Sequence, residues 1–258
     1  MTAEIFLAQV LQKYVARNLI SHWQQISQLK GTLQSWASTC FVNILDSGSR
    51  AKGTAISLAS DVDFLVSLKS DCNENSGGLQ SIYEGLYTKL NNTYQNVSKQ
   101  NVSVRINLSG LQVDVTPARK QKGLINDHWI YLSKTGSRQQ TNIQKHITDI
   151  SQSGRTNEIK IIKIWRELNH LDFPSIYLEY LIVKNILQYK LNGNLASNSW
   201  YILNELAKDT SNPLFAKIVD PANSNNVLSE LLTVGEKNKI IATAKNASRQ
   251  QNWTSIVW

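Results

Sequence analysis

A Gly-Ser pair between two strand-like runs constrains this chain more than any other feature. Residues 40–45 form a β-branched and apolar run, and residues 62–68 alternate apolar with polar side chains, so both runs predict strands. Gly48 and Ser49 follow the first run closely, and Lys52 adds positive charge. Glycine lets the backbone approach an anion, and the first turn of a helix offers free N–H groups. The segment therefore predicts a turn and short helix that bind phosphate.

Three aspartates add an acidic site to this segment. Asp61 and Asp63 lie two residues apart on the second strand, so both carboxylates point to the same side. Two carboxylates this close repel each other unless a cation neutralises them. Mg²⁺ prefers oxygen ligands, and a pair of metal ions shares a further carboxylate. Asp114 fits that role because it lies mid-strand between Val113 and Val115, where a charge needs a reason.

Each part of this pattern also has a plainer interpretation. A lone Asp-x-Asp occurs by chance in many chains, and a Gly-Ser turn is commoner still. Asp114 alone could be an edge-strand charge paired with Arg105 or Arg119. The ordered combination is much more specific: a strand, a Gly-Ser turn, a strand with Asp-x-Asp, and a later strand with a third Asp. That order favours a catalytic metal site over three unrelated surface charges.

Composition limits the classes of protein that fit. The chain has 258 residues, 41% hydrophobic and 18% charged, which is typical of a globular protein with a sizeable core. No stretch approaches the ~18 consecutive apolar residues of a membrane span, and the first residues lack a signal-peptide pattern. Cys40 and Cys72 provide no disulfide framework and no metal-ligand spacing. We therefore expect a cytoplasmic protein without membrane partners, and its net charge of +8 suits polyanionic partners.

The hydrophobic pattern divides the chain into an α/β half and a helical half. Residues 3–38 predict one long helix, or two with a break near Gly31. The remaining predictions are helices over residues 79–95, 158–169, 176–190, 198–208 and 227–246, and paired strands over 102–108 and 111–115 with a turn at 109–110. We expect an α/β core with its N-terminal helix over residues 1–140 and a helical C-terminal domain over residues 141–258.

The motifs together resemble a known superfamily. Gly48-Ser-x-x-Lys52-Gly-Thr followed by Ser60-Asp-x-Asp63 resembles the signature of the DNA polymerase β-like nucleotidyltransferases, in the branch of oligoadenylate synthetase, cGAS and the bacterial CD-NTases. Three later segments are also similar to that branch, and together with the signature they cover residues 40–245: Lys160–Trp165, Phe173–Leu181 and Asp220–Val227. The resemblance implies an α+β, two-lobed fold with a mixed-sheet core, an N-terminal brace helix and a C-terminal helical domain.

The resemblance also implies roles for individual residues. Gly48 and Ser49 would hold a nucleoside triphosphate, and Asp61, Asp63 and Asp114 would bind Mg²⁺, with Mn²⁺ as a substitute. The nucleotide-binding set has four further members: Lys52, Lys163, Ser175 and Tyr177. The family often has a tyrosine at the position of Ile176, so either Tyr177 substitutes for it or the base is held differently. Glu179 is expected to be a buried hydrogen-bonding group with a structural role.

Three kinds of function are compatible with these motifs. The one that the resemblance favours is synthesis of a cyclic or linear oligonucleotide second messenger in bacterial anti-phage signalling, from nucleoside triphosphates, with an RNA or protein activator left open. The second is nucleotide transfer to an RNA 3′ end, as in CCA-adding enzymes, or to a protein. The third is a non-catalytic nucleotide-binding module, which three intact clustered acids argue against because of their energetic cost. The nucleotides used, the product linkage and the oligomeric state do not follow from the sequence.

Overall fold

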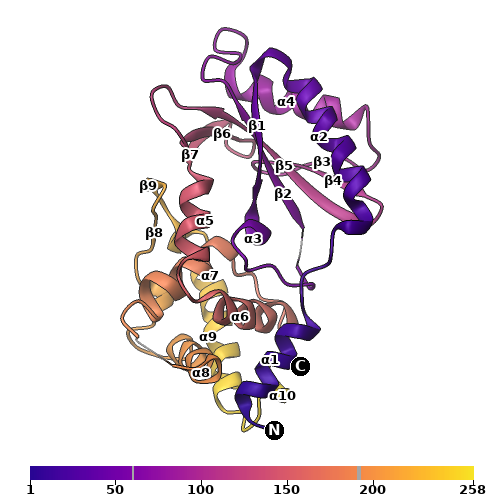
Figure 1. The fold of residues 1–258 in the computed structure, drawn as a ribbon. Helices are drawn as coiled ribbons and strands as arrows, with labels where there is room; N and C mark the ends of the chain where they lie inside the picture. Colours follow the sequence, from indigo (N-terminus) through magenta and orange to yellow (C-terminus); the bar gives the residue numbers. More distant parts are fainter. Residues whose placement is uncertain (60, 191–192) are drawn as a thin grey trace. The chain divides into compact units, whose positions relative to one another are not determined.

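The computed structural model describes residues 1–59, 61–190 and 193–258, which form two compact units (Figure 1). The units alternate along the sequence, because each is built from segments far apart in the chain. Unit 1 comprises Met1–Arg17, Lys52–Ser60 and Thr148–Trp258, and unit 2 comprises Asn18–Ala51 and Asp61–Ile147. The predicted division into consecutive domains, 1–140 and 141–258, stays a prediction about which parts fold independently.

Unit 2 is built on a mixed sheet whose described strands run in the order β1-β2-β5-β4-β3, with β6 and β7 continuing from β5. The pairing of β2 with β5 is parallel, and the other pairings in this sheet are antiparallel. The strands are β1 (Phe41–Ser47), β2 (Val62–Leu68), β3 (Ser98–Lys99), β4 (Val104–Leu108), β5 (Leu111–Lys120), β6 (His128–Leu132) and β7 (Ser137–Thr141).

One face of this sheet packs against two helices, α2 (Trp23–Ala37) and α4 (Gly78–Asn91), which lie beside each other in Figure 1. Leu29 and Leu33 of α2 are fully buried in this core, as are Tyr83 and Leu86 of α4. Alternate residues of β2, β4 and β5 supply the other half of the core. The side chains between them must therefore point to the opposite face of the sheet.

Unit 1 contains a second core that is almost entirely helical. Its centre is Trp165 of α6, which is fully buried beside Tyr177 and Tyr180 of α7. Glu4 of the first helix caps α8, because its carboxylate accepts the backbone N–H groups of Leu195 and Ala196. The helices are α1 (Ala3–Lys13), α6 (Thr156–Leu168), α7 (Ser175–Leu181), α8 (Leu195–Leu206), α9 (Val234–Ser248) and α10 (Thr254–Val257), with a hairpin of β8 (Val219–Asp220) and β9 (Asn223–Val227).

The predicted α+β class with a mixed sheet is confirmed, but some elements differ from the prediction. The N-terminal break lies between Lys13 and Trp23, not near Gly31, which sits inside α2 with nothing close to the position of a Cβ atom. A glycine on an open helix surface costs only about 1 kcal/mol relative to alanine, so it need not end the helix. The sequence analysis did not predict β6, β7 or α5 (Ile143–Ser151).

The two cysteines form a disulfide, so the expectation of unpaired cysteines was wrong. The strand pairing explains this: β1 and β2 are antiparallel with Phe41 opposite Leu68, and the N–H of Lys69 donates to the carbonyl of Cys40 at 2.9 Å. This pairing brings Cys72, in the turn after β2, to a Cα–Cα distance of 5.5 Å from Cys40. A separation of 32 residues concealed this proximity in the sequence.

The described part of the chain contains no helix that is both long and apolar enough to cross a bilayer. The cytoplasmic location inferred from composition stays a prediction.

Candidate active site

A row of charged residues crosses the sheet of unit 2 at one level. Asp63 of β2 pairs with Asp114 of β5 in the parallel register, and Asp114 pairs with Arg105 of β4 in the antiparallel register. Side chains opposite one another on neighbouring strands point to the same face and lie within interaction distance. The sheet therefore brings together two of the three predicted metal-binding residues, which are 51 positions apart in the sequence, and adds an arginine.

The rows on either side explain why this face is polar. Phe64 and Val115 form the next row, and Val62 and Val113 form the preceding one. All four side chains are buried in the core beneath α2 and α4. Because successive residues of a strand alternate between faces, Asp63 and Asp114 are directed away from those helices. The buried apolar residues on either side of each aspartate thus fix the direction of its carboxylate.

Arg105 is the centre of the charge arrangement, which we call the acidic cluster: Asp61, Asp63, Asp114 and Arg105. Its Nε and Nη2 donate to the two carboxylate oxygens of Asp114 at 2.8 and 2.7 Å. Nη2 also lies 3.1 Å from Oδ2 of Asp61, the residue just before β2. The structure therefore brings Asp61 and Asp114 together through a shared guanidinium, and it selects Arg105 from the two arginines that the sequence offered as partners of Asp114.

Electrostatics in the acidic cluster reflect an excess of negative charge. Burial raises the pKa of the Asp61 carboxyl, Arg105 opposes this rise, and the nearby charge of Asp114 adds to it. Hydrogen bonding to Asp114 raises the pKa of Arg105 further above its already high value, so this guanidinium stays charged. One arginine thus faces three carboxylates, and the cluster can accept more positive charge.

Gly48 lies against the acidic cluster at the start of α3 (Gly48–Ala51). Its φ is +63°, and a Cβ atom built on it would stand 1.8 Å from Oδ2 of Asp63. A side chain at this position would therefore clash with the carboxylate as well as strain the backbone. Ser49 follows on the same short helix. The predicted phosphate-binding turn and a predicted metal ligand are in direct contact, whereas Ser60 of the motif lies outside the described residues.

The acidic cluster has the donor atoms that a divalent cation requires. No three His, Cys, Asp or Glu side chains converge as a ready set of metal ligands among the described residues. The donors are nevertheless carboxylate oxygens, as Mg²⁺ prefers, and a cationic group already bridges Asp61 and Asp114. Asp63 joins the same row through its register with Asp114. The residues therefore fit a divalent cation, provided that positive charge from the metal replaces part of what Arg105 supplies.

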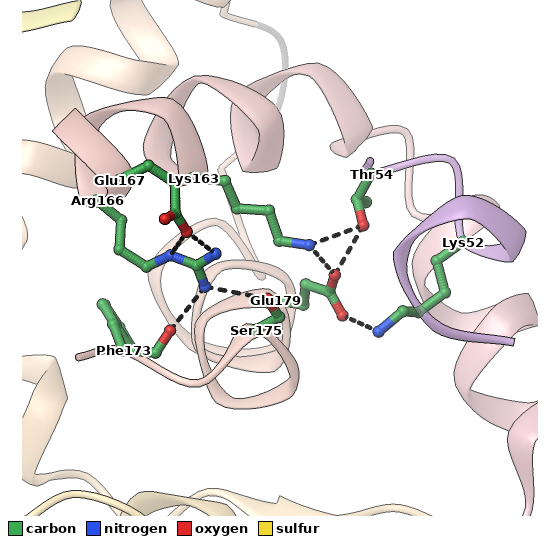
Figure 2. Close-up of polar contacts among 8 residues, drawn as sticks. All are labelled: Lys52, Thr54, Lys163, Arg166, Glu167, Phe173, Ser175 and Glu179. Carbon is green, nitrogen blue, oxygen red and sulfur yellow. Dashed lines mark hydrogen bonds and ion pairs between the residues drawn. The ribbon is translucent and has the colours of Figure 1, made fainter. Parts of the chain in front are cut away.

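Lys52 and Lys163, predicted to contact nucleotide, lie instead in a buried cluster within unit 1 (Figure 2). The Lys52 ammonium donates to Glu179 Oε2 at 2.5 Å, and the Lys163 ammonium donates to Oε1 at 2.7 Å. The hydroxyl of Thr54 donates to the same Oε1 at 2.7 Å and lies 3.1 Å from the Lys163 ammonium. We call these four residues the lysine cluster. It confirms that Glu179 is a buried hydrogen-bonding group.

The lysine cluster is buried, and its two ammonium groups exceed its single carboxylate by one positive charge. Glu179 is 0% exposed and Lys163 is 2% exposed. Burial alone would raise the pKa of Glu179, but Lys52 and Lys163 outweigh burial and hold that pKa at about 2. Burial lowers the pKa of Lys163, and Glu179 only partly offsets this. A contact between Lys163 and a triphosphate would require its ammonium to leave Glu179, so that role stays a prediction.

Ser175 and Tyr177, the predicted base contacts, lie at the start of α7. The Ser175 hydroxyl accepts a hydrogen bond from Nη1 of Arg166 at 3.0 Å (Figure 2). Tyr177 is 0% exposed, and its hydroxyl donates to the carbonyl of Leu214 at 2.8 Å. A fully buried ring offers no face for a base to stack on. Tyr177 therefore does not replace the missing family tyrosine in this conformation, and the alternative that the base is held differently is favoured.

Unit 2 also contains a cavity of about 480 Å³ that no sequence pattern predicted. Ser47, Arg50 and Asp63 line it next to the phosphate-binding turn, and Trp23 and Lys30 of α2 line another part of it. Trp23 is 71% exposed. The exposure of Trp23 and its place at the start of α2 are visible only in the structure, so no signal in the sequence identified this surface.

The fold and the acidic cluster define a class of protein. A mixed sheet carries a Gly-Ser turn against Asp63 of β2 and places a carboxylate of the neighbouring parallel strand, β5, opposite it, and a separate unit is helical. This arrangement is that of a nucleotidyltransferase. Its donor groups are suited to neutralising phosphate and to holding a cation beside it.

Comparison with known proteins identifies the family. Residues 17–153 match the profile of the Second Messenger Oligonucleotide or Dinucleotide Synthetase (SMODS) domain, and the chain belongs to this family. It is 26% identical to a cyclic AMP-AMP-AMP synthase of Escherichia coli (strain MS 115-1), over 86% of this chain and 79% of that protein. The predicted enzyme class is thus confirmed: the chain is a CD-NTase, a nucleotidyltransferase that makes oligonucleotide second messengers from nucleoside triphosphates in anti-phage signalling.

Solved structures confirm the fold. CdnC of E. coli MS115-1, in complex with HORMA-deltaN, has a TM-score of 0.73 at 21% identity, covering 95% of this chain and 89% of that one. CdnG of Bradyrhizobium diazoefficiens, in complex with GTP, has a TM-score of 0.76 at 11% identity, covering 99% and 95%. Both are bacterial CD-NTase structures, as the motifs predicted. At these identities the likeness concerns the fold, and the roles of individual residues rest on the geometry above.

Proposed function

We propose that the chain joins nucleoside triphosphates into a cyclic oligonucleotide, with Asp61, Asp63 and Asp114 holding Mg²⁺ at the acidic cluster. The observation that supports this most is the register of Asp63 with Asp114, together with the guanidinium that bridges Asp61 and Asp114. Carboxylates in this arrangement can bind a cation that exchanges with the solution. ATP is the first substrate to test, because the curated relative is a cyclic AMP-AMP-AMP synthase.

In the proposed reaction, a ribose hydroxyl oxygen bonds to the α-phosphorus of a bound triphosphate. The bond from that phosphorus to the β-phosphate oxygen breaks, pyrophosphate leaves with its electron pair, and the hydroxyl proton is released. Bound divalent ions would lower the pKa of the hydroxyl and neutralise the leaving group. Gly48 allows the triphosphate to approach the backbone, Ser49 would donate to it, and Arg50 lies on the same short helix. The chain itself contributes positioning and neutralisation of charge.

Incubation of the purified protein with four labelled ribonucleotides tests this proposal. The products formed in Mg²⁺ and in Mn²⁺ are resolved before and after phosphatase treatment. The combined variant Asp61→Ala, Asp63→Ala should lose more than about a thousandfold in activity. It should also keep its melting temperature or gain slightly, because carboxylate repulsion is relieved. The matched control is Glu84→Gln, which alters an exposed ion pair with Lys99 on the surface of unit 2.

Each outcome has a defined meaning. A phosphatase-resistant product that the double variant cannot make supports the proposal. The same product from the double variant at an unchanged rate would show that the carboxylates are not the metal ligands. A product that forms only on added tRNA would favour an RNA 3′ end as the acceptor, and labelled protein would favour protein modification. If the wild-type chain makes no product alone, an RNA or protein activator is required, and the absence of turnover with every such addition would argue for a non-catalytic module.

A further inference from the structure

Arg105 occupies a position between the predicted metal ligands. It is on β4, directly opposite Asp114 of β5, and its side chain is 33% exposed. Both oxygens of Asp114 accept hydrogen bonds from it, and one of the same nitrogens reaches Asp61. A forked guanidinium matches a carboxylate in this two-point geometry better than any other side chain does. Arg105 therefore partly neutralises Asp61 and Asp114 by sharing one positive charge between them.

This contact limits what Asp114 can do. A carboxylate that receives a forked pair of hydrogen bonds has both oxygens committed to the arginine, so a metal must compete for them. Asp61 is less committed, because it receives a single bond at 3.1 Å and its side chain is 38% exposed. A guanidinium next to a bound divalent ion also repels it, and the repulsion is only partly screened at a site one-third exposed.

We propose that Arg105 is a positioning residue that holds Asp61 and Asp114 in the metal-free protein and is displaced when a nucleotide-bound divalent ion arrives. Asp61 and one oxygen of Asp114 would then hold the ion, while the other oxygen of Asp114 keeps its bond to Arg105. Arg105 thus stabilises the metal-free enzyme and weakens its affinity for free metal. The metal binds firmly only together with the charge of a triphosphate. This inference rests on the proposed function, because it takes the three aspartates to be metal ligands.

An arginine with only a structural role would behave differently. Its loss would destabilise the protein, but the affinity for metal would stay the same or fall as Asp114 became disordered. A competing arginine predicts opposite signs for the two quantities: lower stability of the metal-free protein and tighter binding of free metal. Measurement of both quantities on one variant therefore separates the two roles.

The experiment is a titration of the full chain with Mn²⁺ followed by electron paramagnetic resonance, without nucleotide and then with a non-hydrolysable ATP analogue. Arg105→Gln should bind free Mn²⁺ about tenfold more tightly than the wild type. Arg105→Lys keeps the charge but loses the fork, so its affinity should lie in between. Thermal unfolding of metal-free Arg105→Gln should occur at a lower temperature, and Mn²⁺ should raise that temperature more than in the wild type. Arg119→Gln is the matched control, because it removes one positive charge from the same sheet.

The results separate failure of this inference from failure of the proposed function. Equal or weaker Mn²⁺ binding by both Arg105 variants, with binding by the wild type intact, would overturn the inference alone. If the wild type binds no Mn²⁺ that depends on Asp61 and Asp63, with or without nucleotide, the metal assignment itself is wrong. If Arg105→Gln does not fold, Arg105→Lys decides, because it should still bind free Mn²⁺ more tightly than Arg119→Gln does.

Discussion

The acidic cluster and the lysine cluster have opposite charge balances and opposite exposure. The first holds three carboxylates and one guanidinium, with Asp61 38% exposed in its side chain. The second holds one carboxylate and two ammonium groups, with Glu179 and Lys163 almost completely buried. Each cluster combines charged residues that the sequence predicted as site residues with one further charged residue that it did not assign to the site. Exposure decides what each cluster can do with its unbalanced charge.

In the acidic cluster, the excess negative charge can be neutralised by cations from the solution. Ions and water can reach the carboxylates, so a cation from solution can oppose the burial and the nearby charge of Asp114 that together raise the pKa of Asp61. In the lysine cluster no such exchange is available, and the groups depend on one another. Glu179 is the shared acceptor of Lys52, Thr54 and Lys163, so its loss would leave two buried ammonium groups without a counter-charge. The exposed acidic cluster is therefore suited to catalysis, whereas the buried lysine cluster is suited to stabilising the fold of unit 1.

Replacement of Glu179 by Gln should give the largest effect that distinguishes the clusters. Breaking a buried ion pair from one side costs about 3–5 kcal/mol of folding free energy, because the partner charge stays buried and unpaired. We expect a loss of that size in chemical denaturation, or failure to fold. The exposed pair of Glu84 and Lys99 serves as the comparison, and Glu84→Gln should cost less than about 1 kcal/mol.

Adding Lys52→Met and Lys163→Met to Glu179→Gln distinguishes the cost of two unpaired buried ammonium groups from the cost of lost hydrogen bonding and packing. If Glu179→Gln is destabilising because it strands two ammonium groups, then adding both lysine replacements should recover part of the loss. No recovery in the triple variant would indicate that the cost comes from hydrogen bonding and packing instead. A small effect of Glu179→Gln alone, similar to that of Glu84→Gln, would contradict the contrast between the clusters.

The sequence predicted the parts of the fold that repeat a local pattern. Strands β2, β4 and β5 alternate apolar with polar residues, and α6 has a clear helical period, so these elements were found within a few residues. Among the missed elements, β7 had no such signal: it reads Ser-Arg-Gln-Gln-Thr, and it is a strand because it pairs with β6. Tertiary pairing, which a single sequence does not display, decided that case.

The candidate site was predictable to the extent that its residues are neighbours in the sequence. Gly48 and Asp63 were found through one motif, and their contact follows from the β1–β2 pairing. The choice of Arg105 over Arg119 depended on the register between β4 and β5, which places Arg105 directly opposite Asp114, whereas Arg119 lies on β5 itself. Lys163 shows the opposite limit, because a lysine on an amphipathic helix gives no indication that a buried glutamate faces it.

Acid titration gives a second, smaller test of the lysine cluster. The pKa of Glu179 is about 2 in the folded protein, below its ordinary value of 4.5. A lowered folded-state pKa means that the carboxylate contributes its full stabilisation above pH 4.5 and loses it as pH falls towards 2. The difference in unfolding free energy between the wild type and Glu179→Gln should therefore be constant above about pH 5 and shrink steadily below it. A difference that stays constant down to pH 3 would show that Glu179 is not ionised in this cluster.

Tyr177→Phe should have the smallest effect, and it tests whether the closed region takes any part in binding. Tyr177 lies two residues before Glu179 on α7, and its hydroxyl donates to the carbonyl of Leu214 inside the core. Removal of that hydroxyl leaves one buried carbonyl without this donor, which should cost about 1 kcal/mol of stability. Because the ring has no exposed face, the relative use of the four nucleotides and the KM for each should not change. A base-dependent change in KM without a loss of stability would place Tyr177 at the nucleotide and would show that α7 takes part in binding.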